Sequence, residues 1–177
     1  MRTVGAVAPS SIYLANKMLK YVDFQAAKVI VEYGPGTGAF TAEIIKRKQP
    51  KTKLFVIEQN QVFSEVLTKK YAHHREVYFI NDSVERVEEI LKQHNAKGVD
   101  YVISGLPFAA LPTHISETIL AKTTKLLGSH GTFITFQYTL FKKSYINRFF
   151  KQIAITKEYR NIPPAYVFCC DNKKAIS

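Results

Sequence analysis

Strand-like and helix-like segments alternate along most of the chain. From residue 28 onward, short runs rich in β-branched and aromatic residues are separated by stretches whose apolar residues recur at helical spacing. In 84–94, for example, Val84, Val87, Ile90 and Leu91 fall on one face of a helix. The expected strands are 29–31, 53–57, 77–80, 99–103, 131–137, 153–159 and 165–170. The expected helices are 10–21, 39–48, 61–71, 84–94, 113–127 and 140–151.

This alternation predicts an α/β fold. Parallel strands are joined by crossover connections, so strands that alternate with helices indicate a mostly parallel sheet. The last two strands are separated only by a break at Ile162-Pro163-Pro164, so they must pair antiparallel. We therefore expect a Rossmann-like, seven-stranded, mostly parallel sheet with an antiparallel closing strand and helices on both faces. Such sheets bind ligands at the carboxyl ends of their strands.

A glycine-rich loop at 34–38, Gly-Pro-Gly-Thr-Gly, lies between the first expected strand and its helix. Glycines there let the backbone turn tightly and approach a ligand closely. Their spacing differs from the Gly-x-Gly-x-x-Gly of pyrophosphate-binding loops. The preceding Glu32 would repel a pyrophosphate but would attract a cation, so the loop favours a cationic ligand.

Two further acidic residues follow the next two expected strands. Glu58 comes 20 residues after Gly38, where a carboxylate can accept hydrogen bonds from both hydroxyls of a ribose. Asp82 follows the third strand, where it can accept from an exocyclic amine. Taken alone, Glu58 could be a solvated helix start and Asp82 a helix N-cap. Together with Glu32 they describe a positively charged nucleoside, and S-adenosylmethionine fits that description.

With these motifs, the chain resembles class I S-adenosylmethionine-dependent methyltransferases over nearly its whole length. The resemblance implies that 32–38 wraps the methionine part of the cofactor, that Glu58 binds the ribose and that Asp82 lies beside the adenine. We expect a single methyltransferase domain over 1–177, with a helical lid segment at 1–27 and a catalytic core at 28–177. The residues expected to bind S-adenosyl-L-methionine are Ser10, Ser11, Glu32, Gly34, Gly36, Thr37, Gly38, Glu58, Gln59, Asp82, Ser83 and Ser104.

The fourth expected strand runs into 104–108, Ser-Gly-Leu-Pro-Phe, which resembles the Asn/Asp/Ser-Pro-Pro-Tyr/Phe motif of amino-group methyltransferases. In that motif a polar side chain and a backbone carbonyl accept hydrogen bonds from the target nitrogen, and an aromatic ring packs on the substrate. The resemblance makes Ser104, Leu106, Pro107 and Phe108 candidate catalytic residues. The candidate substrate-binding residues are Tyr13, Phe108, Arg160 and Asn161. The alternative for Phe108 is a core residue beside a proline-stiffened turn.

Two groups of methyltransferases share this type of loop. Ribosomal RNA adenine dimethyltransferases usually read Asn-Leu/Ile-Pro-Tyr and carry an extra helical domain, for which we expect no room before Ser177. Bacterial phospholipid N-methyltransferases resemble this chain at Pro-Ser-Ser (9–11), Ser-Gly-Leu-Pro (104–107) and Asn-Ile-Pro-Pro-Ala (161–165). These matches favour methylation of a phospholipid headgroup amine. The alternatives are RNA adenine N-methylation and an inactive adaptor that only binds the cofactor.

The amino-acid composition indicates which kind of binding partner the protein has. A net charge of +11 favours a partner that carries phosphate, which both an anionic membrane surface and RNA do. With 46% hydrophobic and 22% charged residues, the 177-residue chain has an ordinary globular composition and suits one domain. The segment 140–151 mixes aromatic and basic residues, so it could lie in a membrane interface or pack on the sheet.

The cellular compartment of the protein can be predicted from its cysteines and from the length of its apolar runs. Cys169 and Cys170 are neighbours and cannot easily form a disulfide with each other, which suits thiols in a reducing cytosol. No zinc-type spacing appears, so no metal is predicted. We expect neither a signal peptide nor a membrane-spanning helix. The expected location is the cytoplasm, at the inner face of the membrane if the acceptor is a lipid.

Overall fold

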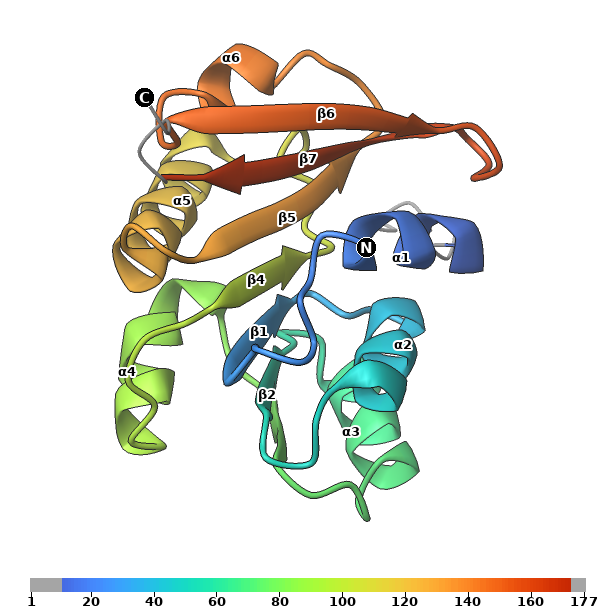
Figure 1. Ribbon diagram of the computed structural model, residues 1–177, viewed down its shortest axis with the longest axis vertical. Helices are drawn as coiled ribbons and strands as arrows, with labels where there is room; N and C mark the ends of the chain where they lie inside the picture. The colour runs from blue at the N-terminus through green and yellow to red at the C-terminus, as the bar shows by residue number, and fades with distance from the viewer. Residues whose placement is uncertain (1–10, 173–177) are drawn as a thin grey trace.

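A seven-stranded sheet with strand order β3-β2-β1-β4-β5-β7-β6 forms the centre of the computed structural model, which describes residues 11–172 (Figure 1). Its strands are β1 (Val29–Tyr33), β2 (Lys53–Ile57), β3 (Val77–Ile80), β4 (Tyr101–Ser104), β5 (Thr132–Gln137), β6 (Gln152–Glu158) and β7 (Ala165–Asp171). Strands β1 to β5 pair in parallel, whereas β7 pairs antiparallel with both β5 and β6. The predicted fold class is confirmed.

The helices cover both faces of this sheet. They are α1 (Ile12–Leu19), α2 (Ala39–Arg47), α3 (Gln61–Lys70), α4 (Val87–Gln93), α5 (Thr113–Leu127) and α6 (Lys143–Ile146), and the 3-10 turn η1 (Val84–Arg86) precedes α4. Figure 1 shows α1, α2 and α3 on one side of the sheet and α4 and α5 on the other. Helix α5 is bounded by Pro112 and Gly128, which explains why its predicted ends agree with the structure.

Alternate residues of the central strands enter two separate hydrophobic cores. On β1, Val29, Val31 and Tyr33 pack with α4 and α5, whereas Ile30 packs with α1 and α2. All five residues of β1 are buried, as expected for a central parallel strand that is covered on both faces. Glu32 lies on β1 with the alternation of Ile30, so its carboxylate is forced into the interior.

The segment 140–151 corrects one prediction. Only Lys143–Ile146 is helical, and the rest of the expected helix consists of turns. Ile146 and Phe150 are buried, and the Phe150 ring stacks on Phe133 of β5 with ring centres 5.4 Å apart. Ile146 and Phe150 therefore cover the sheet while the chain turns into β6, and Phe150 is not available to a membrane.

Residues 11–172 contain no helix that is both long and apolar enough to cross a bilayer. The same residues hold no cluster of three or more His, Cys, Asp or Glu side chains that could bind a metal ion. Cys169 and Cys170 are neighbours on β7 and pack on opposite faces of the sheet, so their side chains point apart.

Candidate cofactor and active site

The glycine loop after β1 is held by a carboxylate from the end of β2. The N–H of Gly36 donates to Oε2 of Glu58 over 3.1 Å, and the N–H of Asn60 donates to Oε1 over 2.8 Å. The N–H of Gly34 donates to the carbonyl of Ile57 over 3.0 Å. The structure thus brings together the loop and the acidic residue that were expected to share a ligand.

Open space lies in front of Gly36. Its φ of 55° belongs to the left-handed region that side chains rarely adopt, and a Cβ built there would meet no heavy atom within 4 Å. A side chain at this position would project into the space that a ligand of the loop needs. The neighbouring Thr37 is exposed, and Gly38 is the N-cap of α2.

Glu32 is fully buried, and only one of its carboxylate oxygens has a partner. Oγ1 of Thr41 donates to Oε2 over 2.8 Å, whereas Oε1 has no hydrogen-bond partner within the described part of the chain. Burial raises the pKa of Glu32 to about 8; the Thr41 hydrogen bond opposes this rise and the nearby Glu58 carboxylate adds to it. An unpaired buried carboxylate oxygen is costly, so this position suits a cationic or hydrogen-bond-donating ligand.

The ends of β2 and β3 are joined by Asn81. Its Nδ2 donates to the carbonyl of Glu58 over 2.8 Å and to that of Gln59, whose side chain is exposed, over 3.1 Å. Asp82 accepts from the N–H of Ser83 over 2.7 Å and forms an ion pair with the guanidinium of Arg86. The N-cap of η1 is Ser83 and not Asp82, so the capping alternative for Asp82 does not apply. Asp82 is half-buried beside the candidate ribose position, and its role at the adenine stays a prediction.

The predicted acceptor loop, 104–108, touches the glycine loop through the backbone. The N–H of Gly105 donates to the carbonyl of Tyr33 over 2.8 Å, and a Cβ on Gly105 would lie 2.6 Å from the carbonyl oxygen of Gly34. Only a glycine permits this approach. Ser104 is fully buried, and its hydroxyl accepts from the N–H of Leu106 over 3.2 Å. The candidate cofactor and acceptor segments therefore belong to one site.

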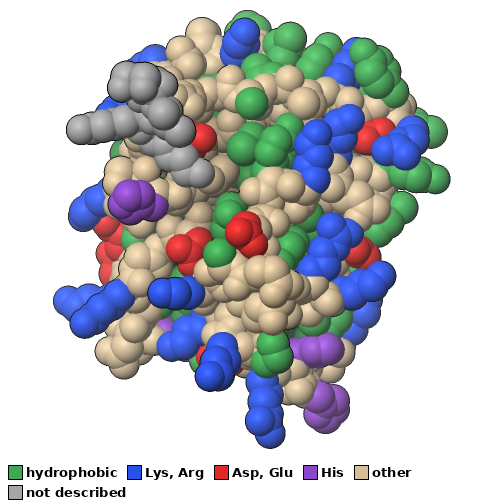
Figure 2. Space-filling model, in the orientation of Figure 1, with side chains coloured by type: hydrophobic (Ala, Val, Ile, Leu, Met, Phe, Trp, Pro, Cys, Tyr) green, Lys and Arg blue, Asp and Glu red, His purple; other side chains and the backbone are tan. Residues whose placement is uncertain are grey.

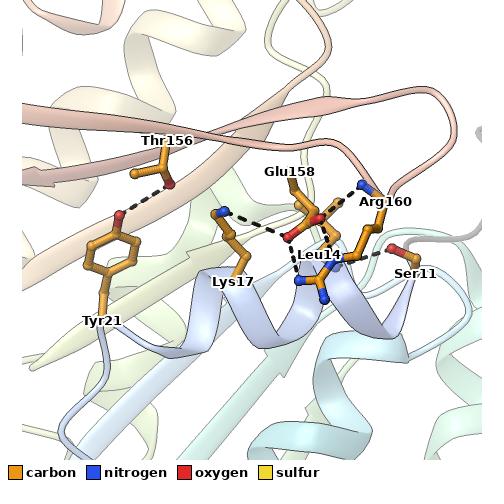
Figure 3. Close-up of polar contacts among 7 residues, drawn as sticks. All are labelled: Ser11, Leu14, Lys17, Tyr21, Thr156, Glu158 and Arg160. Carbon is orange, nitrogen blue, oxygen red and sulfur yellow. Dashed lines mark hydrogen bonds and ion pairs between the residues drawn. The ribbon is translucent and has the colours of Figure 1, made fainter.

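Ser11 connects the start of α1 to the turn between β6 and β7; Figure 3 shows Ser11 at the start of α1, beside Leu14. Its N–H donates to Oδ1 of Asn161 over 3.1 Å, and its hydroxyl caps α1 by accepting from the N–H of Leu14 over 3.2 Å. Asn161 is buried, and its Nδ2 donates to the carbonyl of Pro163 over 2.7 Å. Both ends of the Asn161 amide thus bind the protein's own backbone, while Ser10 lies outside the described residues.

Glu158, at the end of β6, is contacted by two basic side chains (Figure 3). It accepts from Nε and Nη2 of Arg160 over 3.0 and 3.1 Å, and Nζ of Lys17 on α1 lies 3.8 Å away. The hydrogen bonds from Arg160 lower the pKa of Glu158 to about 2. The guanidinium of Arg160 also lies 4.5 Å from the centre of the Tyr13 ring, so two of the candidate substrate residues are neighbours.

Known proteins resemble this chain in both sequence and structure. The family profile described as ribosomal RNA adenine dimethylase matches residues 11–161. The chain belongs to this family. An ornithine lipid N-methyltransferase of Singulisphaera acidiphila is 30% identical over 173 residues, which cover 97% of this chain and 90% of the relative. A ribosomal RNA small subunit methyltransferase A of Mycoplasma capricolum is 30% identical over 118 residues, which cover 66% of this chain and 41% of the relative.

Solved structures support the fold. An rRNA methylase from Streptococcus thermophilus has a TM-score of 0.67 and 13% identity, with 90% of this chain and 94% of that one covered. TrmN from Thermus thermophilus has a TM-score of 0.72 and 11% identity, with 94% of this chain and 50% of that one covered. Together with the family and the relatives, these structures make the chain an S-adenosylmethionine-dependent methyltransferase with a Rossmann-like fold.

The residues of this methyltransferase suit S-adenosyl-L-methionine. The unpaired oxygen of Glu32 and the open space at Gly36 fit a ligand that carries positive charge close to the glycine loop. The cofactor supplies a methyl group that its sulfonium has already activated. Loop 34–38 and Glu58 would hold the cofactor from one side, and the predicted roles of Gln59 and Asp82 at its adenosine part stay predictions.

Phe108 does not lie at the surface of the acceptor loop, where a substrate contact was expected. Its side chain is fully buried in the core, with its ring edge-on to Phe133 at a centre distance of 6.1 Å. The core alternative for this ring therefore describes the structure of this methyltransferase better than a ring packed on the substrate. The exposed Pro107 and half-buried Leu106 remain at the surface of the loop, where an acceptor can reach them.

Gln137, the last residue of β5, was missed by sequence reasoning. It is buried, and its Nε2 lies 3.5 Å from the carbonyl oxygen of Leu106 and 3.4 Å from Oγ1 of Thr135. Thr135 in turn donates to the carbonyl of Ser104 over 3.3 Å. The signal was a polar residue at the carboxyl end of the fifth strand, the kind of position that revealed Glu58 and Asp82.

Proposed function

We propose that this methyltransferase moves the methyl group of S-adenosyl-L-methionine to the amine of a membrane lipid headgroup. The observation that carries the proposal is the extent of similarity to the ornithine lipid N-methyltransferase, which spans 97% of this chain and 90% of that relative. The ribosomal RNA methyltransferase relative shares 66% of this chain, and the match spans only 41% of that protein.

Segments that carried the resemblance to phospholipid N-methyltransferases also have structural roles that support the proposal. The glycine of Ser-Gly-Leu-Pro at 104–107 is required by the contact of Gly105 with Gly34. Asn161, the first residue of Asn-Ile-Pro-Pro-Ala, binds the N–H of Ser11 and closes the turn through Pro163. Both segments thus shape the edge of the sheet at which an acceptor amine would arrive.

The protein's contribution to the transfer is to orient an unprotonated amine and to exclude water. The hydroxyl of Ser104, the last residue of β4, can accept a hydrogen bond from the acceptor nitrogen. The Leu106 carbonyl, two residues beyond the strand, already accepts from the N–H of Phe108 and from Nε2 of Gln137. Ser104 is fully buried, which keeps water away from the reacting atoms. Alignment of the nitrogen lone pair supplies a large part of the rate in such a transfer.

RNA adenine methylation is the second candidate. The family profile and the net charge of +11 favour it. An adenine amino group is neutral at the start, whereas a lipid ammonium must first lose a proton. An inactive adaptor is the third possibility and would bind the cofactor without turnover.

A labelled-methyl assay separates these candidates. The purified protein is incubated with S-adenosylmethionine labelled in its methyl group and with either vesicles that contain ornithine lipid or phosphatidylethanolamine, or structured RNA. We expect the label in the lipid fraction. Label in RNA alone would overturn the proposal in favour of the second candidate. Calorimetric binding of the cofactor with no label in either acceptor would support the adaptor.

A further inference from the structure

Large apolar side chains are exposed on two connections that leave the sheet at the same edge. Leu140 and Phe141, which follow β5, are 44% and 80% exposed. Tyr159 and Ile162, in the connection between β6 and β7, are 72% and 85% exposed. We call these four residues the apolar rim. Exposed apolar side chains that gather on neighbouring connections, and are not scattered singly, mark an interaction surface.

The sheet register places the apolar rim beside the candidate active site. Gln137 at the end of β5 lies opposite Tyr166 near the start of β7, so the connection after β5 begins beside the point where the β6–β7 connection ends. On the other side of β5, Thr135 lies opposite Ser104. Figure 2 shows hydrophobic side chains along the top and upper right of this face, with Lys and Arg side chains among them, where Figure 1 has the β6–β7 hairpin.

Basic groups accompany the exposed rings. Nζ of Lys142 lies 5.9 Å from the centre of the Phe141 ring, and Nζ of Lys157 lies 5.0 Å from that of Tyr159. The segments 138–145 and 159–164 contain no acidic residue, and the adjacent Glu158 is bound by Arg160. Apolar side chains next to cations are the combination that enters the interface of an anionic bilayer.

A lipid surface fits the apolar rim better than RNA does. Aromatic rings can stack on bases, but the aliphatic side chains of Leu140 and Ile162 have no π face to offer. Their transfer from water into the acyl boundary of a bilayer is favourable in itself. The hairpin is also held in place, because Asn161 binds the backbone of Ser11, the N-cap of α1.

We infer that the apolar rim inserts into an anionic lipid surface and so presents the edge of the sheet at Ser104 to lipid amines. The inference rests on the proposed lipid substrate for its purpose, but vesicle binding tests it independently. The partner is a bilayer whose headgroups carry net negative charge. The rim supplies the inserted side chains, while Lys142 and Lys157 lie at the level of the phosphates.

The test is sedimentation of the full-length protein with vesicles of phosphatidylcholine and phosphatidylglycerol. The variant Phe141→Ser with Ile162→Ser removes one exposed side chain from each connection. We expect its partition coefficient to fall by about tenfold or more, because burial of either side chain is worth at least that factor when complete. The matched control, Val62→Ser with Val66→Ser, removes two side chains of α3 that are 68% and 56% exposed, and should bind as wild type.

Further measurements separate the failure of this inference from the failure of the proposed function. Unchanged cofactor affinity by calorimetry is expected for both double variants, since all four side chains are exposed. With a short-chain lipid amine dispersed below its micellar concentration, the rim variant should turn over like wild type, and with vesicles it should be slower. Vesicle binding equal to wild type would overturn the rim inference and leave lipid methylation standing.

Two other results are equally decisive. If wild type methylates no lipid amine but the rim variant still loses vesicle binding, the proposed function fails and the rim inference stands. If the rim variant loses affinity for an RNA oligonucleotide by the same factor as for vesicles, the apolar rim is not a specific lipid surface and the inference is overturned.

Discussion

The cofactor half of the active edge, at the ends of β1, β2 and β3, differs from the acceptor half, at the ends of β4 and β5 and the β6–β7 hairpin. In the cofactor half, Glu58 holds the glycine loop, and one oxygen of the buried Glu32 has no hydrogen-bond partner among residues 11–172. In the acceptor half, Phe108 is buried in the core, and the exposed apolar side chains lie outside the site. The cofactor half therefore suits a charged small molecule, whereas the acceptor half has an apolar outer surface.

The largest expected effect tests whether Phe108 belongs to the core of the acceptor half. Phe108→Ala should lower the free energy of unfolding by about 3–5 kcal/mol, the usual cost of removing a buried aromatic side chain. Urea denaturation measures this change, and Pro107→Ala at the exposed neighbour is the control. If stability hardly changes while KM for the acceptor rises, the Phe108 ring contacts the substrate. Its assignment to the core would then be wrong.

Gly36→Val is the strongest test of the cofactor half. The side chain would enter the open space at the loop on a backbone with positive φ, so we expect cofactor binding to weaken by about a hundredfold or more while the fold survives. Gly98→Val is the matched control, because Gly98 has a φ of 73° and equally open surroundings in a segment before β4. Calorimetry should show wild-type affinity for the control. Equal losses of cofactor affinity in both variants would mean that backbone strain alone causes the effect.

Glu58→Ala should weaken cofactor binding less than Gly36→Val does. The variant loses a charged hydrogen-bond acceptor for the predicted ribose and the contact that holds Gly36, so cofactor affinity should fall by about 1.5–3 kcal/mol. Glu65→Ala removes the same charge from the exposed surface of α3 and serves as the control. Wild-type affinity in Glu58→Ala would remove this carboxylate from the cofactor site.

The remaining prediction concerns the pH dependence of stability that Glu32 confers. Because burial raises its pKa to about 8, the folded protein without cofactor keeps a proton that the unfolded chain releases above its ordinary value of 4.5. The free energy of unfolding should therefore fall as pH rises from 4.5 to about 8, and less so in Glu32→Gln. Cofactor binding should release protons near pH 7, which calorimetry in buffers of different ionisation enthalpy detects. No difference between wild type and Glu32→Gln would contradict the neutral form of Glu32.

The cofactor half was more predictable from the sequence than the acceptor half. Glu32 lies near the end of β1, loop 34–38 follows β1 and Glu58 follows the neighbouring parallel strand β2, so the fold itself brings them together once the strands are recognised. The segment 140–151 was mispredicted because the same aromatic residues suit a long amphipathic helix and a turn packed on the sheet. Gln137 and Glu158 were not found because their partners, Leu106 and Arg160 with Lys17, become neighbours only through tertiary structure or a tight turn.

The contacts between α1 and the β6–β7 hairpin have a consequence for the order in which the protein is completed during synthesis. Ser11 binds Asn161, which is 150 residues later in the chain, and the hydroxyls of Tyr21 and Thr156 are hydrogen-bonded over 3.2 Å (Figure 3). When α1 leaves the ribosome, these partners do not yet exist. The polar contacts between α1 and the hairpin therefore form only when the last strands emerge, whereas the bond between Asn16 of α1 and Arg47 of α2 can form earlier. A nascent chain stalled before β6 thus has the glycine loop but not the closed edge of the sheet.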